Sequence, residues 1–203
     1  MCYVSTVART APNATRRSQS ARRAILAAAL DQVAEVGYAR LSIEGIAAAA
    51  GVGKQTIYRW WPSKGAVLLD SLLALSEGQD GEVMALPDTG DLEADLKLVL
   101  RATVDELTDS RYDGAMRALT AETLRDPALA AMCGERLEAP IKALKLERLR
   151  SAQAAGDLGP ELDLDLAIDV IWGPLFSRWL QRSGPLTAGY ADQVVERALD
   201  GLR

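Results

Sequence analysis

Four side chains that carry hydrogen-bonding groups, Lys54, Gln55, Thr56 and Arg59, fall within one short stretch of this chain. Gln can form two parallel hydrogen bonds with adenine, and Arg can do the same with guanine. On a helix, residues three or four positions apart share a face, so these side chains could enter a groove of DNA together. Their types and spacing predict contacts with base edges or nearby phosphates.

Three further side chains, Ser42, Tyr58 and Lys64, suit phosphate groups better than bases. The two hydroxyls can donate hydrogen bonds, and Lys64 stands at a predicted helix start, where backbone N–H groups also favour an anion. Tyr58 could instead pack against the first helix of the chain, and both roles are compatible.

Residues 41–69 contain the elements that must position these groups. Ser42 is a favourable N-cap for a short, alanine-rich helix, and Gly51 tolerates the left-handed conformation that a tight helix-to-helix turn requires. A second helix is predicted from Gly53 to about Trp60, and Ser63 can cap a third. The pattern is typical of a helix-turn-helix.

At these residues the chain resembles the tetracycline-repressor family of bacterial transcription regulators, over about residues 20 to 70. The matching positions are Ile46, Ala47, Ala50, Gly51, Val52, Thr56, Tyr58, Trp60, Trp61, Ser63 and Lys64. Gly53, Trp61 and Gly65 depart from the family pattern, which often has serine, phenylalanine and an acidic residue there. The resemblance implies a homodimer joined through its last two helices and a repressor that a small-molecule effector releases from its operator.

Charge is distributed unevenly along the 203 residues. Residues 1–70 hold nine Lys and Arg against four Asp and Glu, a balance of +5, and the remaining 14 basic and 24 acidic residues give −10. A basic headpiece on an acidic body suits a protein that reads double-stranded DNA, in which only one part contacts the duplex. A two-fold dimer would read an inverted-repeat operator.

The chain has no histidine, which excludes Ser-His-Asp and Cys-His nucleophiles and most zinc sites. No glycine-rich cofactor loop is present, so we expect no cofactor, no metal and no enzyme. The acidic clusters at 88–95 and 157–169 are interpreted as helix starts. Two cysteines and no apolar run of membrane-spanning length predict a cytoplasmic protein without a membrane partner. A helical-body enzyme or a helix-turn-helix module that binds a protein are the alternative functions.

Helical periodicity without strand patterns predicts an all-α fold. We expect a flexible tail at 1–19, a three-helix DNA-binding headpiece with a linking helix at 20–75, and a helical bundle for ligand binding and dimerisation at 76–203. In the body, Asp91, Asp126 and Asp163 are predicted to begin helices, and Pro140 and Pro174 to break or kink them.

Large side chains at inward positions of the body helices predict a ligand cavity. Its predicted lining is Met116, Leu119, Met132, Leu144, Trp172, Phe176 and Trp179. Few lysines are expected there, which favours an apolar or aromatic effector with Arg178 or an acidic residue as a polar anchor. The helix at 164–180 is apolar on much of its circumference, so Leu175, Val194, Val195, Leu199 and Leu202 are predicted to form the dimer interface.

Overall fold

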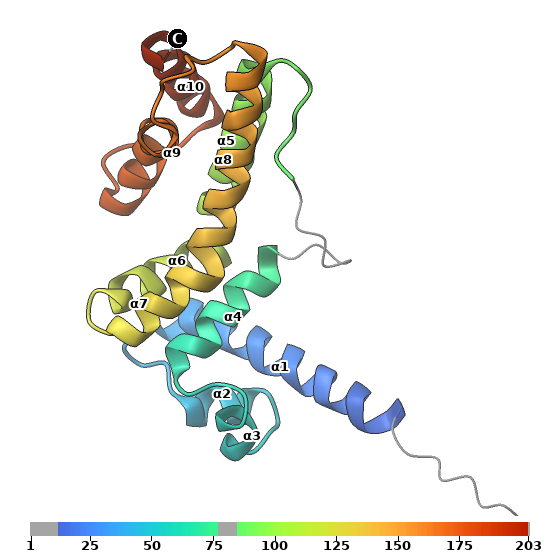
Figure 1. Ribbon diagram of the computed structural model, residues 1–203. Coiled ribbons are helices and arrows are strands. Elements are labelled where there is room, and N and C mark those ends of the chain that lie inside the picture. The colour runs from blue at the N-terminus through green and yellow to red at the C-terminus, as the bar shows by residue number, and fades with distance from the viewer. Residues whose placement is uncertain (1–11, 77–84, 203) are drawn as a thin grey trace, which may run out of the picture. The chain divides into compact units, whose positions relative to one another are not determined.

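The computed structural model describes residues 12–76 and 85–202, and every regular element in these ranges is a helix (Figure 1). The predicted all-α fold is confirmed. In chain order the elements are α1 (Pro12–Val36), α2 (Ile43–Ala49), α3 (Lys54–Tyr58), α4 (Lys64–Ser76), α5 (Leu92–Thr108), α6 (Ser110–Thr123), α7 (Pro127–Cys133), the π-helix η1 (Gly134–Glu138), α8 (Ala139–Ala155), α9 (Leu164–Gln181) and α10 (Ala188–Leu202). No helix in the described ranges is long and apolar enough to cross a membrane.

The chain forms two compact units, residues 1–71 and residues 72–203, which we call the headpiece and the body. The division falls inside α4, whereas the sequence pattern places the boundary at the end of that helix, after Leu75. The helix is continuous across the division.

α1 begins at Pro12, earlier than the start predicted at Ser20. Proline suits the first position of a helix because its fixed φ is already helical and its missing N–H would have no partner there. Residues 18–23 carry no buried side chain, so the first part of the helix has no apolar stripe that periodicity could reveal. Residues 12–19 of the predicted flexible tail are therefore helical, and residues 1–11 lie outside the described ranges.

The headpiece has its own apolar core, to which all four of its helices contribute. α1 packs against α2, and α2 packs against α3. The buried side chains include Ile25, Leu26, Ala29, Leu30, Val33, Ile43, Ile46, Ile57, Trp61, Val67 and Leu68. The ion pair between Arg22 and Asp70, 2.9 Å long, joins α1 to α4 at the edge of this core.

Aspartates cap the body helices as predicted. Asp91 accepts a hydrogen bond from Ala94 N at 3.0 Å, and Asp126 and Asp163 make the corresponding contacts at the starts of α7 and α9. Each carboxylate satisfies N–H groups that have no partner inside the helix. The acidic clusters at 88–95 and 157–169 thus supply two of these caps, Asp91 and Asp163.

The irregularity expected at Pro140 appears as the π-helix η1, where the Ala139 N–H reaches back five residues to Gly134 O. Proline has no N–H for the carbonyl four residues earlier, and its ring would clash with that carbonyl in a regular helix. A wider turn just before Pro140 relieves both problems.

The core of the body is formed mainly by α5, α8, α9 and α10, and α10 packs against both α5 and α9 (Figure 1). A buried ion pair joins α5 to α8, with Arg148 Nη2 2.8 Å from Asp95 Oδ2. Arg148 also donates to Pro87 O at 2.9 Å, and both the backbone N–H and the hydroxyl of Thr89 donate to Asp95. These contacts fix the segment that leads into α5.

Candidate nucleic-acid interface and body cavity

The turn between α2 and α3 is fixed by local interactions. Ser42 Oγ accepts a hydrogen bond from Gly45 N at 3.1 Å, which confirms Ser42 as the N-cap of α2. Gly51 has a φ of 65°, and Val52 N donates to Ala47 O at 3.0 Å. A side chain at Gly51 would be strained in this left-handed conformation, so glycine makes the tight approach to α3 possible.

One side of α3 packs into the core of the headpiece, and the other side is exposed. Ile57 is completely buried, whereas Lys54, Gln55, Tyr58 and Arg59 are exposed, and Tyr58 is 53% exposed. The exposed residues form two adjacent rows, Lys54 with Tyr58 and Gln55 with Arg59, because residues four apart lie one turn above each other. The structure therefore places four of the predicted contact residues, Lys54, Gln55, Tyr58 and Arg59, together on the accessible side of α3 and its C-cap.

Two of these side chains, Lys54 and Arg59, have partners within the headpiece. Lys54 Nζ lies 3.7 Å from Glu44 Oε1 of α2, and both side chains are mostly exposed. The Arg59 guanidinium lies 5.2 Å from the centroid of the Trp60 ring. Thr56 is half-buried, and its backbone N–H donates to Gly53 O at 2.8 Å. Exposed ion pairs of the Lys54 kind contribute little, so a nucleic acid could replace this one at low cost.

Ser42 keeps a hydroxyl proton while its oxygen accepts from Gly45 N–H. The same side chain could therefore cap α2 and donate to a phosphate. Whether Ser42, Lys54, Gln55, Thr56, Tyr58 and Arg59 contact DNA remains a prediction.

Lys64 has a different role from the predicted phosphate contact. Its ammonium donates to Tyr38 O at 2.9 Å and to Leu41 O at 3.0 Å, and it lies 4.2 Å from the centroid of the Tyr38 ring. Two of the three ammonium protons donate to these carbonyls, and the attraction of the charge to the Tyr38 ring holds the group in this position. Lys64 thus ties the start of α4 to the turn between α1 and α2, an interaction that its place in the sequence did not reveal.

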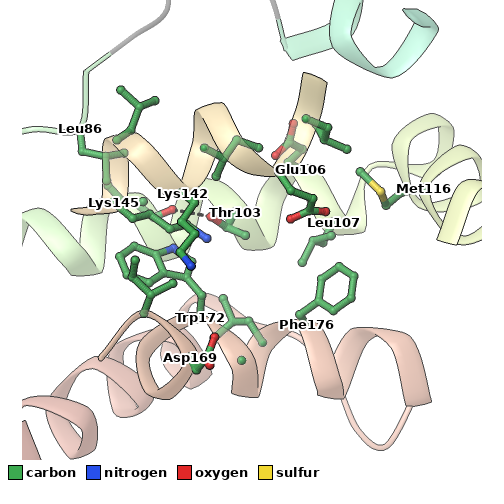
Figure 2. A pocket seen from close by; sticks show the side chains of 18 of the residues that line it. Leu86, Thr103, Glu106, Leu107, Met116, Lys142, Lys145, Asp169, Trp172 and Phe176 are labelled. Atoms are coloured by element: carbon green, nitrogen blue, oxygen red, sulfur yellow. Dashed lines mark hydrogen bonds between the residues drawn. The ribbon is translucent and has the colours of Figure 1, made fainter. Parts of the chain in front are cut away.

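The body contains a cavity of about 740 Å³, within the usual size range of small-molecule sites (Figure 2). Most of its lining is apolar and comes from α5, α6, α8 and α9. Figure 2 places Leu107, Met116 and Phe176 at one end, and Lys142, Lys145 and Trp172 at the other. This cavity lies entirely within the body.

Of the predicted ligand residues, Met116, Leu144, Trp172 and Phe176 line the cavity. Leu119, Met132 and Trp179 do not, so these three assignments are wrong for this cavity. Helical spacing gives the face of a residue but cannot separate core from cavity.

The contacts of Trp179 explain why it does not line the cavity. Its indole N–H donates to Asp113 Oδ1 at 2.6 Å, and the guanidinium of Arg117 lies 4.2 Å from its ring centroid. Side chains of α6 therefore contact the Trp179 ring. Leu119 is likewise buried, with 2% of its surface exposed.

The predicted lysine-poor lining is also wrong, because Lys142 and Lys145 both line the cavity. Arg178, the predicted anchor, instead lies 3.7 Å from the centroid of the Tyr190 ring and donates to Pro185 O. Glu106, Glu138 and Asp169 are the acidic residues of the lining.

A pattern on α8 could have identified Lys145 as a residue of the cavity. Ile141, Lys145, Arg148 and Ala152 recur three or four residues apart on α8, so two cations stand on one stripe with apolar residues. Arg148 is 4% exposed and Lys145 is half-buried. A buried cation needs a partner of opposite charge or a hydrogen-bond acceptor; Arg148 is paired with Asp95, whereas Lys145 lines the cavity.

The predicted dimer residues need a correction. Leu175, Val195 and Leu199 are at most 1% exposed and belong to the core of the body, so they are not available to a second copy. Val194 and Leu202 are half-buried. α9 instead exposes Leu166, Val170 and Leu180, at 55%, 38% and 43%. α9 is apolar on two sides: one side packs into the core and the other is exposed. The periodicity of the sequence does not distinguish the two sides.

Comparisons with known protein families agree with this architecture. Residues 25–70 match the model described as bacterial regulatory proteins of the tetR family. Residues 86–198 match the model described as a tetracyclin repressor-like C-terminal domain. The two matches cover the headpiece helices and nearly all of the body.

Individual relatives are similar over most of their length. The helix-turn-helix transcriptional regulator YdeS of Bacillus subtilis (strain 168) is 31% identical over 92% of this chain and 92% of its own. The DNA-binding transcriptional repressor TetR of Mycobacteroides abscessus is 30% identical over 90% of this chain and 94% of its own. The crystal structure of the TetR-family regulator SCO0332 is 33% identical, with a TM-score of 0.72 over 91% of this chain and 99% of that one.

Proposed function

This chain belongs to the tetracycline-repressor family of DNA-binding transcription regulators, and we propose that it is a homodimeric repressor that a small molecule releases from an inverted-repeat operator. Repression is also the role for which the Mycobacteroides abscessus relative is named. The observation that carries the proposal is the exposed face of α3, where four polar side chains surround a single buried anchor, Ile57.

The two rows on α3 suit different parts of a duplex. Gln55 and Arg59 can bond bidentately to adenine and guanine, and we assign them to base edges. Lys54, Thr56, Tyr58 and Ser42 are assigned to phosphates or to the edges beside them, where their donors position the helix. Lys64 is left out because its protons are used inside the headpiece.

Dimerisation is assigned to the exposed stripe of α9. Leu166, Val170, Gly173, Ser177 and Leu180 follow one another at alternating spacings of four and three, which places them on one side of the helix. Two copies related by a two-fold axis would bury this stripe against itself. The small residues in the middle, Gly173 and Ser177, allow two helices to approach closely.

Selection of bound sequences from a random duplex pool tests the DNA-reading proposal. We expect an enriched inverted repeat whose half-sites lie about one helical turn, or a small multiple, apart. Binding to the enriched site should weaken steeply between two salt concentrations. A pool without enrichment, while the folded protein captures another protein, would favour the alternative in which the helix-turn-helix binds a protein.

Val170→Asp tests the dimer surface, because Val170 is exposed and outside the core. The variant should remain helical, sediment as a monomer and lose tight binding to the inverted repeat. Gln193→Asp on α10 places the same charge at another exposed position and serves as the control. A Val170→Asp protein that stays dimeric would refute the α9 interface.

The release proposal rests on the cavity. A ligand can dissociate the DNA complex only if it binds the released conformation more tightly than the bound one. Compounds that quench tryptophan fluorescence should therefore also dissociate the operator complex, and Trp172→Ala should weaken both effects together. Ligands that fill the cavity and leave DNA affinity unchanged would show that the cavity is not the switch.

A further inference from the structure

Lys145 brings a positive charge into the cavity without a partner to balance it. Its ammonium lies 4.6 Å from the centroid of the Trp172 ring. Among the residues that the structure describes, no hydrogen-bond acceptor or carboxylate is within bonding distance of it. Trp172 is 8% exposed, so the ammonium and the ring together form one wall of the cavity.

The positive charge of Lys145 is not fully balanced by the groups around it. Burial lowers the pKa of Lys145, and the more distant carboxylates of Glu138 and Asp169 raise it by less, so the net shift is downward. Burial of a charge is unfavourable unless an opposite charge or a hydrogen-bond acceptor accompanies it. An acceptor supplied by a ligand would remove this deficit.

The neighbouring lysine does not share this deficit. Lys142 Nζ lies 2.7 Å from Asp165 Oδ1, and both side chains are more than half exposed. Lys142 therefore sits at the rim of the cavity with a partner of its own. It also provides a matched control for Lys145, one turn away on the same helix.

The opposite end of the cavity is suited to an apolar group. Leu107 of α5, Met116 of α6 and Phe176 of α9 converge there (Figure 2). The Phe176 and Trp179 rings lie 5.0 Å apart, tilted by 46°, so Trp179 contacts Phe176. Methionine adapts to irregular ligand surfaces because its side chain is unbranched and polarisable.

We infer that the cavity binds an apolar carboxylate whose charged group pairs with Lys145 beside Trp172 and whose hydrocarbon part extends toward Met116 and Phe176. This inference rests on the proposed ligand-responsive function and names the chemical class of the ligand. It replaces Arg178 by Lys145 as the polar anchor.

The acidic lining residues do not favour a cationic ligand instead. Glu138 and Asp169 are exposed, so water already solvates their charges, and the half-buried Glu106 has an interaction partner of its own. Burial raises the pKa of Tyr112, as do the nearby carboxylates of Glu106 and Glu138, so its hydroxyl stays protonated and can donate to a carboxylate. Tyr112 and Lys145 both line the cavity, and both present donors.

Calorimetric titration of the full-length protein with three probes of equal chain length tests the inference. Decanoate, 1-decanol and decylammonium differ only in the head group. Decanoate should bind at least about tenfold more tightly than the other two, which corresponds to roughly 1.4 kcal/mol. 2-Naphthoate and 2-naphthol repeat the comparison with a flat aromatic body.

Two variants test whether Lys145 causes the preference for decanoate. Lys145→Met keeps the apolar stem and removes the charge, so it should abolish the preference for decanoate while 1-decanol binds within about twofold of its former affinity. Lys142→Met should change both affinities little, since Lys142 has its own partner at the rim. No binding by either carboxylate, equal binding of acid and alcohol, tighter binding of decylammonium, or a preference that survives Lys145→Met would each overturn the inference.

The same titrations, repeated with the selected operator duplex present, separate this inference from the proposed function. A Lys145-dependent preference for carboxylates without loss of DNA binding would support the ligand class and refute ligand release. Release by a neutral or cationic compound that occupies the cavity would support the proposed function and refute the ligand class.

Discussion

The exposed face of α3 and the cavity of the body are built in opposite ways. α3 is a short helix whose candidate contact residues are neighbours in sequence and point to solvent around one anchor, Ile57. The cavity collects its lining from several helices spread over residues 86–176. An exposed side chain on α3 can be substituted without disturbing the core. The side chains that line the cavity, by contrast, lie next to the core of the body.

This difference predicts how function and stability separate in the two regions. In the headpiece, most groups that could read DNA are distinct from those that hold the helices, such as Gly51 and Lys64, and Ser42 alone is assigned to both tasks. In the body, Leu175 belongs both to the core and to the cavity wall. Substitutions should therefore alter binding alone in the first region and stability together with binding in the second.

The largest effect is expected at the buried ion pair of the body. Asp95→Asn leaves the Arg148 guanidinium buried without its carboxylate, and breaking such a pair by removing one partner costs about 3–5 kcal/mol. The free energy of unfolding, measured by urea titration, should fall by that amount. Arg101→Met removes the more exposed pair with Asp192 and should have a much smaller effect. Equal losses in the two variants would contradict the role of burial.

The same pair predicts a dependence on pH. Burial alone would raise the pKa of Asp95, but hydrogen bonds from Thr89 and Arg148 outweigh it, so the pKa lies below its usual value. The stabilisation is therefore present above about pH 4 and is lost as the pH falls through the lowered pKa. Unfolding measured from pH 6 to pH 2 should show a steeper loss for the wild type than for Asp95→Asn.

Lys64→Met should reduce stability by about 2 to 3 kcal/mol, because it removes two charge-assisted hydrogen bonds to the backbone of the turn at 38–41. The slope of log affinity for DNA against log salt should stay the same, since Lys64 does not neutralise a phosphate on this structure. Thermal unfolding and salt titrations measure the two effects. A slope reduced by about one unit would restore the phosphate contact predicted from the sequence.

Gln55→Ala and Arg59→Ala should leave stability unchanged and relax specificity at particular base pairs by about 1 to 3 kcal/mol. Binding to operators with single base-pair changes measures the loss. Lys54→Ala should instead weaken binding equally on all of these sequences. A uniform loss in Gln55→Ala or Arg59→Ala would assign that residue to the phosphates.

The smallest effect is expected at Glu44, which lies beside Lys54 on the exposed surface of the headpiece. Glu44→Gln removes a negative charge next to the proposed DNA-binding face and frees the lysine for phosphate. DNA affinity should rise about twofold to threefold at low salt, and the gain should vanish at high salt because exposed charges are screened. A loss of affinity would show that Glu44 positions Lys54 for binding.

Most of the fold could be predicted from local sequence. The caps at Ser42, Asp91, Asp126 and Asp163 and the stop at Gly51 are short-range signals, and they gave the helix starts and ends closely. The start of α1 was missed because its first residues have no apolar stripe. The wide turn before Pro140 was foreseen as a break, although its π-helical form was not.

The candidate site was predictable where it is local and less so where it is not. Gln55 and Arg59 share a face of α3 because they are four residues apart, a relation that the sequence contains. The internal contacts of Lys64 were not predicted because its partners, the carbonyls of Tyr38 and Leu41, are more than twenty residues away. No local pattern indicates that contact.

Helix type, helix ends and the pattern of polar side chains on α3 were determined by the sequence alone, because each depends on interactions within about one helical turn. Tertiary structure decided which of two apolar sides of α9 faces the core, which of Trp172 and Trp179 lines the cavity, and which lysine is buried. These choices depend on what packs opposite each residue, and that neighbour comes from a distant helix. Lys145 beside Trp172 and Arg148 beside Asp95, two cations on one stripe of α8, differ only in that neighbour.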